Sequence, residues 1–163
     1  MSQQAKQLIA QAKAEKWTRL DLGNCGLTDL NTEVPELFEL THLEELVLSN
    51  EWWEWNEEEK KRVEKISQNT GDGNKLNKLP KGIGRLKNLR VLICGEWFGE
   101  RWGITDLSPL SGLVNLTLLD LNYNQITDLT PLSGLVNLTR LNLDCNQITD
   151  LSPLSGLVNL TLL

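Results

Sequence analysis

The chain has 163 residues, of which 40% are hydrophobic and 23% are charged, a composition typical of one soluble domain with a continuous core. Its 16 basic residues are outnumbered by 22 acidic ones, so nucleic acid and anionic membranes are disfavoured as partners. No apolar run reaches the roughly 18 residues of a membrane-spanning helix, and the start MSQQAKQLIAQAKAEK lacks the apolar core of a secretory signal. We therefore expect a cytoplasmic protein.

The N-terminal segment, residues 2–16, has the pattern of a helix. Ser2 can act as its N-cap. Its apolar residues fall on one face at helical spacing: Ala5, Leu8, Ile9 and Ala12. Because this narrow apolar stripe lies directly before a repeated pattern, we expect the helix to cap the open end of the core that the repeats build.

From residue 17 onward the chain repeats a unit of about 22 residues, which indicates a solenoid. The period is clearest in LSPLSGLVNLTLLDLNYNQITD, which starts at Leu107, and in LTPLSGLVNLTRLNLDCNQITD, which follows it. The alternation Leu119-x-Leu121 predicts a strand whose leucines point inward. Strands are expected near residues 18–23, 44–49, 90–95, 117–122 and 139–144.

Asparagines stand where a unit must turn after its strand: Asn74, Asn124 and Asn146. A buried amide at that corner can satisfy backbone groups left unpaired there and in the adjoining coil, so we predict a structural role. The PLSGL segments combine a proline that fixes φ with a glycine that tolerates a tight bend. They predict a 3₁₀ or irregular convex side.

The pattern LxxLxLxxNxI resembles the leucine-rich repeat, and its SPLxGLxNLTxL variant resembles the short repeats of internalin-type bacterial proteins. This resemblance implies an α/β fold, a right-handed leucine-rich-repeat solenoid with a short parallel β-sheet on its concave side. The first half, with LIAQAKAEKWTRLDLGNCGLTDL and LPKGIGRLKNL, resembles the repeat domains of bacterial Roco-type multidomain proteins over residues 5–95. In that family such an arm precedes a GTPase module.

We expect one domain over residues 1–163, in which two insertions interrupt the repeats. Repeats 1 and 2 cover 17–50, an insertion covers 51–73, repeat 3 covers 74–96, a short insertion covers 97–103, and regular repeats fill 104–163. The last unit stops at Leu163, before its turn. We expect either a fragment of a longer chain or self-association through the open C-terminal repeat.

The two insertions hold most of the aromatic residues: Trp52, Trp53, Trp55, Trp97, Phe98 and Trp102. Both leave the solenoid after successive strands, so these rings should emerge on the same edge. They either pack on each other or form an aromatic rim that grips a partner protein. Within the first insertion, a capping box of Asn56 with Glu59 and favourable i,i+4 charge pairs predict a helix over 57–68.

The outward-facing strand positions predict a concave ladder that binds a partner: Arg19, Asp21, Glu45, Val47, Val91, Ile93, Leu118, Asp120, Asn122, Arg140, Asn142 and Asp144. Its middle is apolar, and an exposed apolar patch tends to mark a binding site. The alternative is that the second insertion folds over Val91 and Ile93 and buries them.

No catalytic, cofactor or metal site is indicated by the sequence. Gly71 to Lys75 lacks the spacing of a phosphate-binding loop, and His42 is the single histidine. The cysteines are isolated at Cys25, Cys94 and Cys145. We therefore expect a non-catalytic protein–protein interaction module. The alternatives are a sensing arm of a larger Roco-like GTPase signalling protein and a spacer between other domains.

Overall fold

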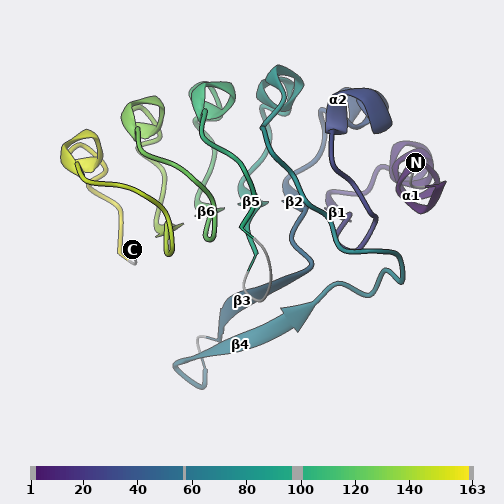
Figure 1. Ribbon diagram of the computed structural model, residues 1–163, viewed down its shortest axis with the longest axis horizontal. Helices are drawn as coiled ribbons and strands as arrows, with labels where there is room; N and C mark the ends of the chain where they lie inside the picture. Colours follow the sequence, from purple (N-terminus) through teal and green to yellow (C-terminus); the bar gives the residue numbers. More distant parts are fainter. Residues whose placement is uncertain (1–2, 57, 97–100, 162–163) are drawn as a thin grey trace.

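The computed structural model describes residues 3–56, 58–96 and 101–161, which form an arc of stacked coils (Figure 1). In this part of the chain the strands of the concave sheet are β1 (Arg19–Asp21), β2 (Glu45–Val47), β5 (Val91–Ile93), β6 (Leu118–Asp120) and β7 (Arg140–Asn142). They are parallel, in the order β1-β2-β5-β6-β7. The predicted strands are confirmed, and each observed strand lies within its predicted range.

The convex side is built from short helical turns, as the proline and glycine pattern predicts. A short helix, α2 (Leu30–Glu33), begins at the N-cap Asp29, whose carboxylate accepts from the N–H of Asn31. The remaining turns are 3₁₀ helices: η1 (Pro35–Glu39), η2 (Lys81–Arg85), η3 (Ser108–Leu110), η4 (Thr130–Leu132) and η5 (Ser152–Leu154). Each lies at the outer edge of its coil (Figure 1).

The core is one continuous stack of inward-facing side chains. The central residue of each strand is buried: Leu20, Leu46, Leu92, Leu119 and Leu141. At the N-terminal end, helix α1 (Gln3–Glu15) buries Ala5, Ile9 and Ala12 against this stack, so the predicted cap is confirmed over its described residues. Burying a leucine contributes roughly 1.5–3 kcal/mol, so the coils are held mainly by contact with their neighbours.

Buried asparagines tie adjacent coils together through their side-chain amides. Asn74 is 4% exposed, and its oxygen accepts from the N–H groups of Cys25 (3.2 Å) and Leu27 (2.8 Å). Its nitrogen donates to the carbonyls of Leu22 and Leu48, both at 2.7 Å. The amide therefore closes the corner of its own coil and that of the preceding one, as predicted.

The same arrangement recurs in the regular repeats. Asn124 accepts from the N–H of Ile104 at 3.3 Å, and donates to the carbonyls of Cys94 and Leu121 at 3.1 Å each. Asn146 bonds in the same pattern one coil further on. These are the hydrogen bonds that the predicted structural role of the asparagines requires.

The first insertion is a β-hairpin, so the helix predicted over 57–68 is wrong. Strand β3 (Glu51–Asn56) pairs antiparallel with β4 (Lys61–Ile66). The oxygen of Asn56 does accept from the N–H groups of Glu58 (3.0 Å) and Glu59 (2.8 Å), but it caps a turn. Lys60 then adopts a left-handed conformation, with φ of 51°, and reverses the chain.

The hairpin forms because its sequence suits a strand ladder better than an isolated helix. The tryptophans of EWWEWN are strong strand formers, and they sit opposite charged residues in the register Trp52↔Lys65 and Trp53↔Glu64. An i,i+4 charge pair contributes only about 0.2–0.5 kcal/mol to a helix. A six-residue partner strand outweighs two such pairs.

Both insertions leave the solenoid from one repeat position. In uninterrupted coils this position is left-handed, with φ of 50° at Asn24, 51° at Tyr123 and 57° at Cys145. Asn50 and Glu96 stand at the equivalent place, and the Asn50 amide donates to the Glu96 carboxylate. The two exits are therefore joined, and Glu96 is buried.

The return from the hairpin is fixed to the first coil. The Ser67 hydroxyl donates to the Asp21 carboxylate at 2.9 Å, and the Asn69 amide donates to the carbonyls of Asp21 (3.0 Å) and Gly23 (2.9 Å). Gly71 passes so close to this coil that a Cβ there would lie 2.6 Å from the Asn24 carbonyl oxygen. The hairpin is thus held at both of its ends.

We expect Asn124→Ala to lower the free energy of unfolding by about 2–4 kcal/mol, because it leaves buried backbone groups of two coils unpaired. Asn137→Ala is the matched control. Asn137 is exposed and ties coils with one bond, to the Val114 carbonyl, so its loss should cost less than about 1 kcal/mol. Chemical denaturation of both variants measures the difference. Equal losses would contradict the role assigned to the buried amides.

Candidate functional site

The outward side chains of the concave sheet form rows across the strands, set by the register. The first row is Arg19, Glu45, Val91, Leu118 and Arg140. The second row is Asp21, Val47, Ile93, Asp120 and Asn142. A third row follows two residues further along each coil: Gly23, Ser49, Gly95, Asn122 and Asp144.

The second row is covered by the hairpin. The ring of Trp52 packs on Val47 and Ile93, which are only 1% and 4% exposed. Val91 and Leu118 contact the edge of this small cluster and stay partly exposed. The alternative, that an insertion buries Val91 and Ile93, is therefore correct for Ile93 alone. The residue that covers Ile93 is Trp52 of the first insertion. Residues 97–100 of the second insertion lie outside the described part.

Much of the third row is also closed to a partner. Ser49 and Asn122 are each 1% exposed, and the Ser49 hydroxyl accepts from the N–H of Gly95 at 3.0 Å. The amide nitrogen of Asn122 is buried and has no hydrogen-bond partner within the described ranges. Of the predicted ladder in this row, Asp144 is exposed.

The first row remains open, and it lines a groove between the sheet and the hairpin. This first-row groove has a volume of about 240 Å³ and is lined by Arg19, Glu45, Val47, Glu54, Val91, Ile93, Leu118 and Arg140. Its floor is apolar and is formed by Val91 and Leu118, which lie side by side as register partners in β5 and β6. The predicted ladder is thus open along its first row, while in the other two rows Asp21 and Asn142 are partly exposed and Asp144 is exposed.

An ion-pair cluster forms one end of this groove. Arg19 lies 3.4 Å from the Glu45 carboxylate and 3.5 Å from that of Glu54 in β3. Glu54 also accepts from the indole N–H of Trp52 at 3.1 Å and lies 3.7 Å from Lys65. Exposed pairs of this kind contribute little stability, so they add charge to this end of the groove, while the packing of Trp52 holds the hairpin on the sheet.

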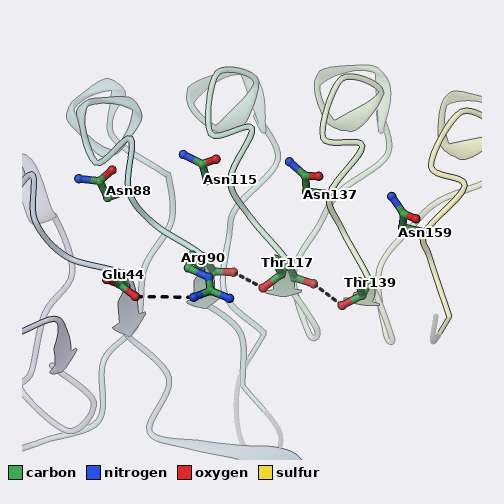
Figure 2. Close-up of a pocket in the computed structure, with 8 residues that line it drawn as sticks. All are labelled: Glu44, Asn88, Arg90, Asn115, Thr117, Asn137, Thr139 and Asn159. Carbon is green, nitrogen blue, oxygen red and sulfur yellow. Dashed lines mark hydrogen bonds and ion pairs between the residues drawn. The ribbon is translucent and has the colours of Figure 1, made fainter.

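A second groove, on the flank between the sheet and the convex turns, is polar (Figure 2). Its volume is about 580 Å³, and its lining residues are Glu44, Asn88, Arg90, Asn115, Thr117, Asn137, Thr139 and Asn159. Each asparagine donates to a carbonyl of the preceding coil at 2.9 Å. The two threonine hydroxyls donate to backbone carbonyls in the same way. These side chains tie coils together, so we assign them a structural role.

Asp120, in β6, is the second carboxylate of the second row, besides Asp21 in β1. It is 5% exposed, and burial raises its pKa to about 6. The Asn122 N–H and the Asn142 amide, both 3.1 Å away, oppose this rise, as does the charge of Arg62 in β4, while Asp144 adds to it. The fold therefore raises the pKa of this carboxyl group well above its ordinary value.

The predicted aromatic rim separates into packed and partly exposed rings. Trp52 is buried on the concave sheet, and Trp102 is 1% exposed within the main core. Trp53 is partly exposed, on the opposite face of β3 from Trp52. The side chain of Trp55, and Trp97 and Phe98 altogether, lie outside what the structure describes.

Sequence reasoning missed Glu54 and the true place of Trp102. Glu54 lines the groove because β3 alternates, and that alternation is visible in EWWEWN once it is taken as a strand. Trp102 precedes Ile104 by two residues, as Asn124 precedes Ile126. It therefore occupies the position of the turn asparagine, which a count back from the isoleucine would have shown.

Within the described residues, no cluster of three or more His, Cys, Asp or Glu side chains could hold a metal ion. In the same part of the chain, no helix has both the length and the apolar character needed to cross a membrane.

Comparisons with known proteins agree with the repeat pattern. The regular repeats match the family model of Leucine Rich repeats (2 copies) over residues 103–134 and 114–156. A comparison with curated proteins found no match. The predicted leucine-rich-repeat resemblance is confirmed, whereas the Roco resemblance of residues 5–95 stays a prediction.

Solved structures share the fold. An internalin (inlF) of Listeria monocytogenes is 27% identical over 93% of this chain and 35% of its own, with a TM-score of 0.65. Internalin C2 of the same organism is 26% identical over 97% of this chain and 79% of its own, with a TM-score of 0.54. The Arabidopsis thaliana receptor kinase ectodomain GASSHO1/SCHENGEN3 is 20% identical over 78% of this chain and 13% of its own, with a TM-score of 0.53. The chain thus folds as a leucine-rich-repeat solenoid and spans about a third of the first internalin.

We expect Trp52→Ala to release the hairpin from the sheet. The change removes the ring from Val47 and Ile93, and should cost about 2–4 kcal/mol locally. Hydrogen exchange of the β3 and β4 amides measures this, since the hairpin can open without unfolding the solenoid. Ile66→Ala, in β4, is the control, because this side chain is 52% exposed and its loss should leave that exchange nearly unchanged. Equal protection in both variants would show that Trp52 does not hold the hairpin.

We expect Asp120 to make the folded state less stable as pH rises from about 4 to about 7. Because its pKa is raised from 3.8 to about 6, the native state binds more protons than the unfolded state in this window, and the group's contribution falls by roughly 2–3 kcal/mol. Asp120→Asn should abolish this fall in denaturation curves measured across pH.

Asp128→Asn provides the contrast for this measurement. Hydrogen bonds from the Thr130 hydroxyl and N–H lower the pKa of Asp128, so this exposed group contributes stability above its unfolded pKa and loses it on acidification. The two variants should therefore change the pH dependence in opposite directions. A pH profile unaltered by Asp120→Asn would contradict the assignment.

Proposed function

We propose that this chain is a non-catalytic protein–protein interaction module that seats a segment of a partner protein in the first-row groove. Leucine-rich-repeat folds generally mediate protein–protein interaction. Because function depends on the site and not on the fold, the proposal rests on the residues of this groove. The cytoplasmic location stays a prediction.

One observation carries the proposal: two neighbouring aliphatic residues, Val91 and Leu118, stay partly exposed in a concave, walled groove. The hairpin covers the remaining apolar residues of the concave sheet, Val47 and Ile93. Apolar surface that is left open inside an otherwise covered patch is typical of a binding site. The groove volume of about 240 Å³ lies below the roughly 300–1,000 Å³ of small-molecule pockets, which favours a few side chains of a protein segment.

The similar structures are compatible with this use of the fold. The Arabidopsis ectodomain named above was solved in complex with CASPARIAN STRIP INTEGRITY FACTOR 2. That likeness concerns the fold alone, and the rows of side chains that line the first-row groove belong to this chain. Of the predicted aromatic rim, we propose Trp53 as an additional contact, because it is partly exposed on the outer face of the hairpin.

The test is a binding selection with a random-peptide display library on the immobilised full chain, followed by affinity measurements with the selected peptides. Leu118→Arg should reduce their affinity at least tenfold, because it puts a charge on the apolar floor. The variant should fold, since Arg19 and Arg140 already occupy the same row in neighbouring coils.

Val136→Lys is the matched control on the convex side. Val136 is 48% exposed, and Lys87 stands at the equivalent position of another coil, so the change adds one positive charge without strain. Selected peptides should bind this variant as they bind the original chain. Peptides that bind Leu118→Arg and the original chain equally well would refute the first-row groove as the binding surface.

A further inference from the structure

Strand β4 is an open edge of the hairpin. Within the described residues it pairs with β3 alone, and it makes no other backbone–backbone hydrogen bond. It lies on the side of β3 that is away from the concave sheet (Figure 1). Its side chains are exposed, apart from Val63, which is partly buried. At one end the Ile66 carbonyl accepts from the Gln68 amide at 3.1 Å. The rest of this edge offers N–H and C=O groups to a further strand.

A hairpin of two strands gains stability from a third. Two paired strands are marginally stable by themselves, and Trp52 is the one buried side chain among the described side chains of β3 and β4. In addition to the proposed use of the first-row groove, we propose that β4 binds an extended segment of a partner protein, which pairs with it antiparallel as a third strand. In this mode of binding the main chain supplies affinity and alternate side chains supply specificity.

The charged residues of β4 fall into two groups. Lys61 and Lys65 already pair within the chain, with carboxylates 3.0 Å and 3.7 Å away. Arg62 and Glu64 are exposed and form no ion pair in the described part of the chain, although the charge of Arg62 helps to lower the pKa of Asp120. Opposite charges in facing positions of two strands attract each other. The added strand therefore gains from a glutamate opposite Arg62 and a lysine opposite Glu64, and needs no charge opposite the two lysines.

The same charges disfavour a second copy of this chain as the added strand. When all six residues of β4 pair antiparallel with those of another copy, Arg62 of each copy faces Lys65 of the other. Like charges in facing positions are destabilising, and this contact occurs twice. A partner strand avoids it and can place aliphatic side chains opposite Val63 and Ile66, of which Ile66 is 52% exposed. The sequence Ile-Thr-Lys-Val-Glu-Thr meets these requirements in antiparallel register and carries no net charge.

The experiment is an NMR titration of the isotope-labelled full chain with this peptide and with Ile-Thr-Glu-Val-Lys-Thr, in which the two charges are exchanged. Both peptides have one composition and no net charge, so the chain's charge of −6 favours neither. The first should shift the β4 amide signals and bind about fivefold more tightly. On the chain with Arg62→Glu and Glu64→Arg together, whose net charge is unaltered, the preference should reverse. Equal affinities on the original chain, or a preference that does not reverse, would overturn the inference.

N-methylation of the first peptide tests the main-chain hydrogen bonds. The N–H groups of alternate residues point to the same edge of a strand, so methyl groups on the odd-numbered or the even-numbered residues block one edge each. One of these two peptides should lose affinity about tenfold, while the other binds nearly as before. Equal affinities of the two would contradict strand addition. Leu118→Arg should leave the binding of the unmethylated peptide unchanged. A loss on this variant would place the peptide in the first-row groove, which would overturn the assignment to β4 and leave the proposed function standing.

Discussion

This structure depends on hydrogen bonds to the backbone N–H and carbonyl groups at the corner where each coil leaves the sheet. The leucine stack brings these corners into the interior, where an unpaired N–H or carbonyl costs about 1–3 kcal/mol. A side-chain amide supplies both a donor and an acceptor, and Asn74, Asn124 and Asn146 use theirs on the preceding coil as well as their own. The repeat is therefore a unit that completes its neighbour.

This dependence explains where the asparagine is absent. The first coil has Cys25 at this position, and it has helix α1 before it in place of a coil whose corner needs closing. Its own corner is closed by Asn74 of the next coil. In the third coil the position holds Trp102, and there the Leu48 carbonyl of the preceding coil is already bonded by Asn74. The adjacent Gly103 N–H donates to the Leu76 carbonyl at 2.9 Å, so the backbone itself adds a link between these coils.

The elements that the repeat pattern determines could be predicted from the sequence. The elements that depend on contacts between distant segments of the chain were predicted wrongly. The strands, the convex turns and the turn asparagines follow from the repeat period, and the capping helix follows from the helical spacing of its own apolar residues. The segment 57–68 reads as a helix when it is considered alone, because Asn56 and Glu59 satisfy a local rule. Its strand depends on pairing with β3, and the place of Trp52 depends on Val47 and Ile93, which belong to two different coils. Which row of the predicted ladder stays open was set by the same contact, so no pattern along the chain could reveal it.

The position of the insertions also determines which surface is left for binding. Both leave from the corner after a strand, where regular coils have a left-handed residue. A longer connection at this corner does not interrupt the pairing of the strands in the sheet. A hairpin starting there reaches first over the third row and then over the second, and Trp52, the second residue of β3, already anchors it on Val47. The first row lies at the opposite ends of the strands, where Val91 and Leu118 contact the edge of this cluster and stay partly exposed. The hairpin thus narrows the open part of the concave sheet to a groove that is lined by residues of both the sheet and the hairpin. Glu54 lines this groove from the hairpin and pairs with Arg19 of the sheet, so the shape of the groove depends on the position of the hairpin.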